Sequence, residues 1–355
     1  MRTPGIVSSG WWVAAAAGLL SLVIVAVLIL PIFTNRQDGA VVAPAFDLRN
    51  PRVPRELIVS AMARDALQVL VEPATIGPEE IERFNREERG KLLVPHDRVI
   101  GVHINGQARA YPLRVMRWHE VVNDVVGGQA VAVTYSPLCD SVVVFSREVG
   151  DAVLELGVSG LLYNSNPLLY DRTQDPSTSP LWTQLDGRAV AGPDPASQPE
   201  LSPRLATLTT WQDWREQHPE TDILAQIPEM KKLYKRDPYH SYFGSDLLRF
   251  PVDPLPPGNH GLKERLVVVA VDGVDVDLSL AKLAAHAGKH SGSAQVDVLG
   301  LPLKIDFDTD LGVAAVTPLE TPERLQSVRY AFWFAWYAMN HSQKGTIPGI
   351  ISAAN

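Results

Sequence analysis

The stretch TYSPLCDSVVVF, residues 134–145, reads as the end of an apolar strand, a polar turn and a second apolar strand. Near-continuous apolar runs bounded by turn residues are typical of strands that are buried on both faces. The runs 130–135 and 142–145 therefore predict two neighbouring strands of a buried sheet, joined by the turn 136–141. Because sites are often built on loops that a rigid sheet holds in place, this turn is also the first place to expect chemistry.

Three segments that are distant from one another in the sequence carry reactive side chains. Cys139 in the turn is the only cysteine of the chain, which excludes an internal disulfide. His119 and Glu120 lie upstream on a short helix predicted over 115–122, and Asp171 lies downstream in a polar turn. The sequence predicts that the thiol, the imidazole and the carboxylate share one cavity.

Cys139 has three interpretations, which the sequence leaves open. As a nucleophile it needs its pKa lowered by a neighbouring cation or histidine, and Cys139, His119 and Asp171 would form the catalytic set. As a soft metal ligand it would suit copper or zinc, with His119 as partner and Glu120 or Asp124 as a further donor. As a small hydrophobic residue it would only fill the core.

Further side chains of the same segments are expected to line the site. They are Asn123, Tyr135, Ser136, Asp140, Ser159, Tyr170, Arg172 and Trp182. Structural roles compete with these functional roles, namely a neutral, hydrogen-bonded His119 and an ion pair between Asp171 and Arg172 at a loop corner. His119 and Glu120 are adjacent on a helix and point in different directions, which makes a shared ion difficult.

The N-terminal residues predict a membrane anchor. The run 11–33 contains no charged residue, and as a helix it would be about 35 Å long, enough for a hydrocarbon core of about 30 Å. A cleavable signal peptide is the alternative, but the small-x-small site formed by residues 43–45 lies well past the run. We therefore expect a single-pass protein of the cell membrane with its C-terminal body outside the cytoplasm.

The composition is that of a globular protein with a real core, since 46% of its 355 residues are hydrophobic and 20% are charged. The net charge of -8 leaves no basic footprint, so we expect no nucleic acid among the partners. The sequence has no Gly-rich phosphate loop, no His-Glu-x-x-His motif and no Gly-x-Ser-x-Gly motif. A small ligand or a partner protein of the cell envelope is the remaining expectation.

Local patterns predict several elements outside the site. Apolar spacing predicts helices over 55–70 and 208–218. A proline at the start and acids in the first turns predict a helix over 78–89, and the apolar run 330–339 predicts a helix that closes the core of the second unit. The stretch 98–110 predicts a β-hairpin, because Asn-Gly between alternating apolar runs is the strongest short hairpin signal.

The hairpin region has a second copy in the chain. Residues 97–113 align without a gap with residues 264–280, and residues 129–133 are echoed by residues 295–298. The second copy lacks the His-Glu pair, the cysteine and the Asp-Arg turn. This is the pattern of a duplicated fold with one working site.

The predicted fold is α+β and rich in β-structure, with a transmembrane helix followed by two related β-rich units and peripheral helices. The expected boundaries are 1–36 for the tail and anchor, 37–54 for a tether, 55–205 for the first unit with the site, 206–257 for a helical connection and Pro-rich linker, and 258–355 for the second, degenerate unit.

The motifs around the turn also resemble a known family. Together with TYSPLCDSVVVF, the motifs are AYPL at 110–113, HEVVND at 119–124, GVSG at 157–160, LLYDR at 168–172 and SPLW at 179–182. In this order they resemble the uncharacterised bacterial and archaeal family known as domain of unknown function 3179, over residues 94–222. The resemblance implies an exported or membrane-anchored protein. The family pattern at the turn is Cys-Pro-Leu-Cys, and Ser136 takes the first position here, so a two-thiol mechanism is not available in that form.

Two hypotheses of different classes follow. The first is a site in the first unit, built on Cys139, His119 and Asp171, that binds a transition metal or performs thiol chemistry. The second is a non-enzymatic ligand-binding or scaffold module of the envelope.

Overall fold

The computed structural model describes residues 46–87, 92–258, 261–341 and 346–348. The predicted tail and anchor, and residues 37–45 of the predicted tether, lie outside these residues. In the described part of the chain, no helix has both the length and the apolar character that a membrane span requires. The chain from Phe46 onward forms one compact unit, and all the elements below belong to it.

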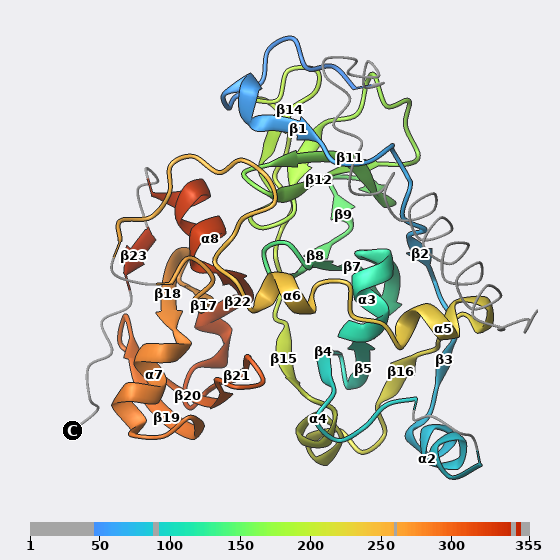
Figure 1. Cartoon of the computed structure of the whole chain (residues 1–355), viewed down its shortest axis with the longest axis vertical. Coiled ribbons are helices and arrows are strands. Elements are labelled where there is room, and N and C mark those ends of the chain that lie inside the picture. Colours follow the sequence, from blue (N-terminus) through green and yellow to red (C-terminus); the bar gives the residue numbers. More distant parts are fainter. Residues whose placement is uncertain (1–45, 88–91, 259–260, 342–345, 349–355) are drawn as a thin grey trace, which may run out of the picture. The chain divides into compact units, whose positions relative to one another are not determined.

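Two large mixed sheets make up most of this unit (Figure 1). The strands of the first large sheet are β2 (Leu70–Val71), β6 (Val121–Val126), β7 (Gln129–Ser136), β8 (Ser141–Ser146), β17 (Arg265–Val271), β18 (Val274–Ser279), β22 (Leu325–Phe332) and β23 (Thr346–Pro348). Their order across the sheet is β2-β6-β7-β8-β22-β17-β18-β23.

The second large sheet also has eight strands. They are β3 (Thr75–Ile76), β4 (Arg98–Ile104), β5 (Gln107–Pro112), β15 (Thr207–Thr210), β16 (Asp222–Leu224), β19 (Ser291–Val298), β20 (Leu301–Asp308) and β21 (Val313–Pro318). Their order is β19-β20-β21-β15-β4-β5-β16-β3.

A smaller sheet of five strands is inserted between β8 and β15 in the chain, with its first strand taken from further upstream. Its strands, in sheet order, are β1 (Ile58–Ser60), β11 (Leu156–Tyr163), β12 (Asn166–Asp171), β13 (Leu181–Thr183) and β14 (Ala189–Ala191). A short hairpin of β9 (Glu148–Val149) and β10 (Ala152–Val153) precedes it.

Helices lie at the ends and outer faces of the sheets. They are α2 (Pro78–Glu87), α3 (Leu113–His119), α4 (Trp211–Gln217), α5 (Lys231–Tyr234), α6 (His240–Phe243), α7 (Leu280–Ala287) and α8 (Trp333–Asn340), with 3-10 turns η1 (Arg55–Leu57), η2 (Pro228–Met230) and η3 (Pro322–Arg324). The β-rich α+β fold class is confirmed.

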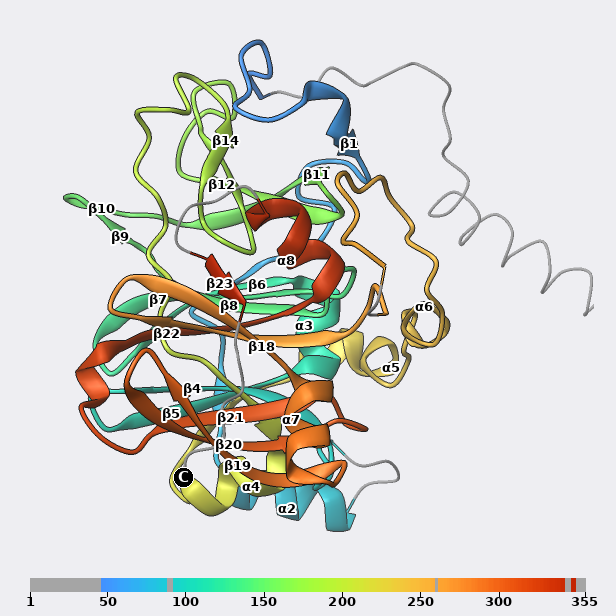
Figure 2. The same ribbon diagram turned by 90° about the vertical axis from the view of Figure 1, so that its left-hand side faces the viewer.

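The first large sheet is buried on both faces. On β8, Val142 and Val144 belong to the apolar core shared with the second large sheet, whereas Val143 and Phe145 belong to a core shared with the small sheet and α8. Figure 2 shows the two large sheets as stacked layers, with α8 on the outer side of the first. Burial on both faces explains the near-continuous apolar runs that predicted these strands.

Several local predictions are confirmed. The predicted hairpin is β4 and β5, and its turn residues Asn105 and Gly106 both have positive φ, 47° and 82°, as a two-residue hairpin turn requires. The helix predicted over 208–218 is present as α4 but is shorter, because residues 208–210 belong to β15. It begins after Thr210, whose hydroxyl accepts from the Asp213 N–H at 3.1 Å.

The helix predicted over 55–70 is wrong. This segment contains the single turn η1 and then β1, which pairs with β11 at the edge of the small sheet. Pairing with a sheet edge overrides the helical spacing of the apolar residues. The helix predicted over 330–339 is shifted, because residues 330–332 complete β22 and α8 begins at Trp333.

The same order of elements occurs twice along the chain. The first half, β4 to β16, runs as hairpin, helix, three strands, strand, helix and strand, with the small sheet inserted before β15. The second half, β17 to β23, has the same order. Arg98 begins β4 and its aligned residue Arg265 begins β17. By this order β19 corresponds to β6, so the sequence echo between 129–133 in β7 and 295–298 in β19 joins strands that are not equivalent.

The two halves exchange strands. The three strands after α3 lie in the first large sheet beside β22, β17, β18 and β23, whereas the three strands after α7 lie in the second large sheet beside β15, β4, β5 and β16. The junctions match, with Tyr330 opposite Val142 in one sheet and Leu208 opposite Ala314 in the other. Each large sheet is therefore built from both halves.

Candidate functional site

Cys139 lies in the turn between β7 and β8, at the end of the first large sheet. Ser136 and Ser141 pair across this turn, and Asp140 has a positive φ of 42° that reverses the chain. The side chain of Cys139 is completely buried, and its thiol donates to the Ser165 carbonyl oxygen at 3.3 Å. The sulfur therefore faces the turn between β11 and β12 of the small sheet.

Burial raises the pKa of the Cys139 thiol to about 12 and outweighs the lowering by the Asn166 amide and the Ser136 hydroxyl. The carboxylates of Glu120 and Asp140 raise this pKa further by charge repulsion. At neutral pH the sulfur is therefore a thiol, and it needs a proton acceptor before it can act as a nucleophile.

Glu120 lies beside the same turn. It follows α3 with a positive φ of 60°, and its carbonyl accepts from the N–H of Tyr135, which directly precedes Ser136, at 2.8 Å. The residue is only 6% exposed, and its carboxyl makes no hydrogen bond or ion pair with any residue in the described ranges. Burial without a partner raises the pKa of this carboxyl to about 8.

Ser136 is the third polar residue beside this turn, after Cys139 and Glu120. Its hydroxyl is completely buried and, within the described residues, its oxygen has no hydrogen-bond partner, although it lies close enough to the Cys139 sulfur to lower the pKa of the thiol. Buried polar groups almost always have partners, so an unpartnered one calls for an explanation. We refer to Ser136, Cys139 and Glu120 as the thiol–carboxyl cluster.

Residues 239–250, which include α6, pack against this cluster and form what we call the covering segment. The Tyr242 hydroxyl donates to the carbonyl of Leu138, the neighbour of the cysteine, at 2.8 Å. Lys263 holds the segment from outside, because its Nζ donates to the carbonyls of Tyr242 at 2.5 Å and Leu247 at 2.9 Å. The same Nζ lies 3.4 Å from the centre of the Tyr242 ring.

The covering segment also carries a cation and two tyrosines that sequence reasoning missed. The Arg249 guanidinium lies over the rings of Tyr239 and Tyr242, at 5.1 Å and 4.9 Å from their centres. Burial raises the pKa of Tyr239, and the nearby charge of Glu120 raises it further. The aromatic run PYHSYF at 238–243 was the available signal, but nothing in its spacing connects it with the turn at Cys139.

His119 has other partners. One ring nitrogen lies 2.5 Å from the Gln68 carbonyl oxygen and the other lies 2.7 Å from the Tyr234 hydroxyl, so neither nitrogen is directed at Cys139. Burial lowers the pKa of this imidazole, which keeps it neutral at pH 7. The geometry is that of a buried, hydrogen-bonded histidine.

Asp171 lies at the far end of β12 from Asn166, the end that is near Cys139. Five residues of extended chain separate the two ends by about 17 Å. The Asp171 carboxylate instead accepts from the N–H groups of Thr173 at 3.1 Å and Glu155 at 3.2 Å, and so fixes the following turn. The structure does not bring Asp171 to the thiol.

Asp124 is also separated from the thiol. Its carboxylate accepts from Arg109 Nη1 and from the Tyr111 hydroxyl, both at 2.7 Å, on the side of the first large sheet that faces the second. Cys139 belongs to the core on the opposite side. Within the described residues, no group of three His, Cys, Asp or Glu side chains could hold a metal ion. The donors expected for copper or zinc do not converge.

Asp140 is held by four hydrogen bonds from three side chains. Both Arg98 Nη atoms donate to its carboxylate at 3.1 Å, Arg265 Nε donates at 2.8 Å, and the Tyr135 hydroxyl donates at 2.9 Å. Burial would raise the pKa of this carboxyl, but the two guanidinium groups outweigh burial and hold the pKa well below its usual range. Asp140 therefore stays charged and fixes the turn that carries the thiol.

The other residues expected to line the site mostly hold the small sheet. Asn123 makes two hydrogen bonds to the backbone of Leu156, at 2.8 Å and 2.9 Å. Ser159 donates to a backbone carbonyl of β12 at 2.6 Å, and the Trp182 indole N–H donates to the Pro199 carbonyl at 2.9 Å.

Tyr170 and Arg172 lie near the other end of the small sheet. The Tyr170 hydroxyl donates to Asp65 at 2.5 Å, and burial raises the pKa of that hydroxyl to about 12. Arg172 pairs with Glu155 at 2.6 Å, not with its neighbour in sequence. Of the residues expected to line the site, only Ser136, Tyr135 and Asp140 lie in or next to the turn that carries the thiol.

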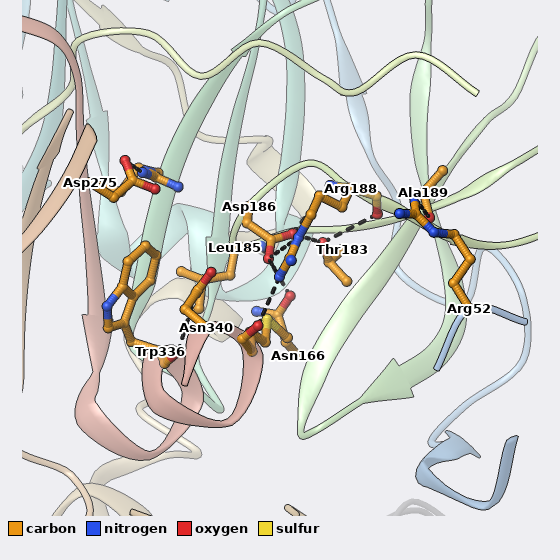
Figure 3. A network of polar contacts seen from close by, with 12 residues as sticks. Arg52, Asn166, Thr183, Leu185, Asp186, Arg188, Ala189, Asp275, Trp336 and Asn340 are labelled. Carbon is orange, nitrogen blue, oxygen red and sulfur yellow. Dashed lines mark hydrogen bonds and ion pairs between the residues drawn. The ribbon is translucent and has the colours of Figure 1, made fainter. Parts of the chain in front are cut away.

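Asn166 connects the thiol region with the rest of the small sheet. Its Nδ2 donates to Gln184 at 2.9 Å, and its Oδ1 accepts from the Leu185 N–H at 3.1 Å. A few residues further on, Arg188 donates from Nε to Asp186 at 2.8 Å and from Nη2 to a carbonyl of α8 at 2.9 Å (Figure 3). The thiol region is thus tied to the last helix of the second half.

Comparison with known proteins identifies the family. No curated protein and no solved structure matches the chain. A family whose description is "Protein of unknown function (DUF3179)" matches residues 74–343. The match extends beyond the resemblance seen over 94–222 at both ends, and it spans both halves of the strand-exchanged body. Because it covers more than half of the sequence, the chain belongs to this family of proteins of unknown function.

Proposed function

We propose that the thiol–carboxyl cluster is a thiol site in which Glu120 accepts the proton of Cys139. One observation carries this proposal: a buried carboxyl without a hydrogen-bond partner belongs to a residue whose backbone contacts the strand leading into the turn of the only thiol, and its charge acts on that thiol. A fold that needed only packing here would be more stable with an apolar residue, because burying an unpaired carboxyl is costly. Such groups gather at functional sites.

The ionised Glu120 carboxylate takes the proton from Sγ, and the sulfur forms a bond with an electrophilic carbon or sulfur of the substrate. The leaving group departs with the electrons of the broken bond and receives the proton from Glu120. A carboxyl with a pKa of about 8 suits this role, because a general base works best when its pKa is near the working pH.

Alkylation of Cys139 by iodoacetamide between pH 6 and 10 tests the proposal. The carboxylate raises the pKa of the thiol by charge repulsion, so a purely electrostatic role predicts faster alkylation in Glu120→Gln. A general base predicts the opposite, a rate at pH 8 that falls about 100-fold in the variant, as is typical for loss of such a base. Cys139→Ser is the control and should take up no label.

Either of two results would overturn the proposal: the folded wild-type protein is not alkylated at any of these pH values, or Glu120→Gln reacts at least as fast as the wild type. Circular dichroism spectra of the variants would show whether they keep the fold.

A second candidate is the non-enzymatic ligand-binding or scaffold module. The observation in its favour is that the thiol is completely buried and donates to a backbone carbonyl, as a structural cysteine does. Under this proposal Glu120→Gln and Cys139→Ala leave the binding of a ligand intact.

We also propose that the body is presented outside the cytoplasm on a single N-terminal membrane anchor, and that the two halves arose by duplication. The uncharged run 11–33 supports the anchor. The common order of elements and the gap-free alignment of the two hairpins support the duplication.

A further inference from the structure

A groove of about 540 Å³ lies along α7 in the second half of the chain. Its floor is the face of the helix that carries Ala281, Ala284 and Ala285. Its rim includes the basic residues Lys263, Arg265 and Lys289, together with His290. The volume is within the range of ordinary small-molecule sites, about 300–1,000 Å³.

Larger side chains occupy the equivalent face of α3 in the first half. In the alignment of the two halves, Arg114, Arg117 and Trp118 stand where α7 has its three alanines. Arg117 pairs with Asp237 at 2.6 Å, and Arg114 donates to the Leu92 carbonyl at 3.2 Å, so the chain covers its own helix there. The groove exists because the second half has small residues at these three positions.

The rim of the groove is electropositive. Arg265 bonds to Asp140 through Nε, and neither of its Nη atoms donates to a residue that the structure describes. Lys289 and His290 are exposed. Glu264 is the acid among the lining residues, and its carboxylate already accepts a hydrogen bond from a serine hydroxyl of β18. A ligand with a negative charge would meet cations at the rim.

We propose that the groove beside α7 binds a small amphipathic anion, with its apolar part on the alanine face and its acid group at Lys289, His290 and Arg265. An apolar floor with a few charged groups at one end is the usual composition of a ligand site. Arg265 lines the groove and also binds Asp140 in the turn that carries Cys139, so the test uses Ala285 and Lys289, which have no part in the proposed thiol chemistry.

Calorimetric titration of the full-length protein with 2-naphthalenesulfonate tests the proposal. The uncharged 2-naphthalenesulfonamide is the matched ligand. We expect one site, with the sulfonate bound at least about tenfold more tightly than the sulfonamide. Equal affinity for the two ligands, or no binding of either, would contradict the proposal.

Three variants locate the site. Ala285→Trp restores the side chain of the first half, and it should abolish binding by filling the groove. Lys289→Glu should weaken the sulfonate about tenfold while leaving the sulfonamide unchanged. Lys282→Glu changes an exposed lysine of α7 that does not line the groove, and it should bind as the wild type does. Wild-type binding by Ala285→Trp and Lys289→Glu, with unchanged thermal unfolding, would rule the groove out.

Discussion

Arg98 and Arg265 begin equivalent strands of the two halves, and both bind the same carboxylate, that of Asp140. In the corresponding turn of the second half, Gly312 takes the place of Asp140, and its carbonyl oxygen accepts from Arg98 at 3.0 Å. Two equivalent arginines thus share one carboxylate, which only the first half of the chain supplies. The turn that carries Cys139 is fixed by residues from both halves of the chain.

Asp140→Asn should destabilise the protein strongly. The change leaves two partly buried guanidinium groups without their counter-charge, and removal of one partner of a buried ion pair costs about 3–5 kcal/mol. We expect the free energy of unfolding in urea to fall by about this amount. Asp310→Asn alters an exposed acid in the corresponding turn of the second half and should cost less than about 0.5 kcal/mol.

The pH dependence of this difference gives a further check. The pKa of Asp140 is lower in the folded protein than its unfolded value of about 3.9, so its stabilising contribution is complete above that value. The contribution is lost as the pH falls through the folded pKa. The gap between the wild type and Asp140→Asn should therefore shrink below about pH 4. A gap that stays constant to pH 2 would mean that the carboxylate charge is not the cause.

Glu120→Gln should show the opposite dependence. The pKa of this carboxyl is raised to about 8, so the neutral form stabilises the fold below the unfolded pKa of about 4.3, and this stabilisation is lost as the pH rises to 8. The wild type should therefore lose stability relative to Glu120→Gln between about pH 4.3 and 8, by at most about 1.4 kcal/mol per pH unit. Parallel stability curves for the two proteins across this range would show that the carboxyl is not buried as described.

The main features of the fold could be predicted from local patterns, and the arrangement of the halves could not. Asn105 and Gly106 determine a tight hairpin through backbone conformation alone, and the double burial of β8 is visible as an unbroken apolar run. The helix prediction for residues 55–70 was wrong because the strand that pairs with β1, namely β11, lies far away in the sequence. The exchange of strands between halves depends on contacts such as Tyr330 with Val142, which no single window of sequence contains.

The site was predicted in the right turn but with the wrong partners. Cys139 was found because it is the only thiol, but His119 was selected because its residue type fits the chemistry, and both of its nitrogens are engaged elsewhere. Its neighbour Glu120 ends the helix with a positive φ, a conformation that the sequence does not predict for a glutamate, and its charge acts on the thiol. Tyr242 reaches the turn of the thiol from a distant segment, which Lys263 holds from outside, and only the folded structure shows these contacts.

Lys263→Met should loosen the covering segment and speed alkylation of Cys139. The substitution removes the donor to the Tyr242 and Leu247 carbonyls but keeps much of the apolar length of the side chain. Opening of the segment should become easier by roughly 1.4 kcal/mol, which corresponds to a rate about tenfold higher when opening limits access. Lys282→Met on α7 is the control and should leave the rate unchanged. An unchanged rate in Lys263→Met would mean that the reagent reaches the thiol by another path.

The proposed membrane anchor rests on the amino-acid sequence alone. The full-length protein should sediment with membranes and resist extraction at alkaline pH, whereas a chain without residues 1–36 should be soluble. Leu22→Arg places a charge near the centre of the run 11–33, at a cost of about 2.5–3.5 kcal/mol for insertion, and should weaken anchoring, while Leu22→Ala should not. A cleaved signal peptide predicts a different result, a smaller soluble protein whose first residue lies beyond Ala45. Mass spectrometry of the protein purified from cells distinguishes the two outcomes.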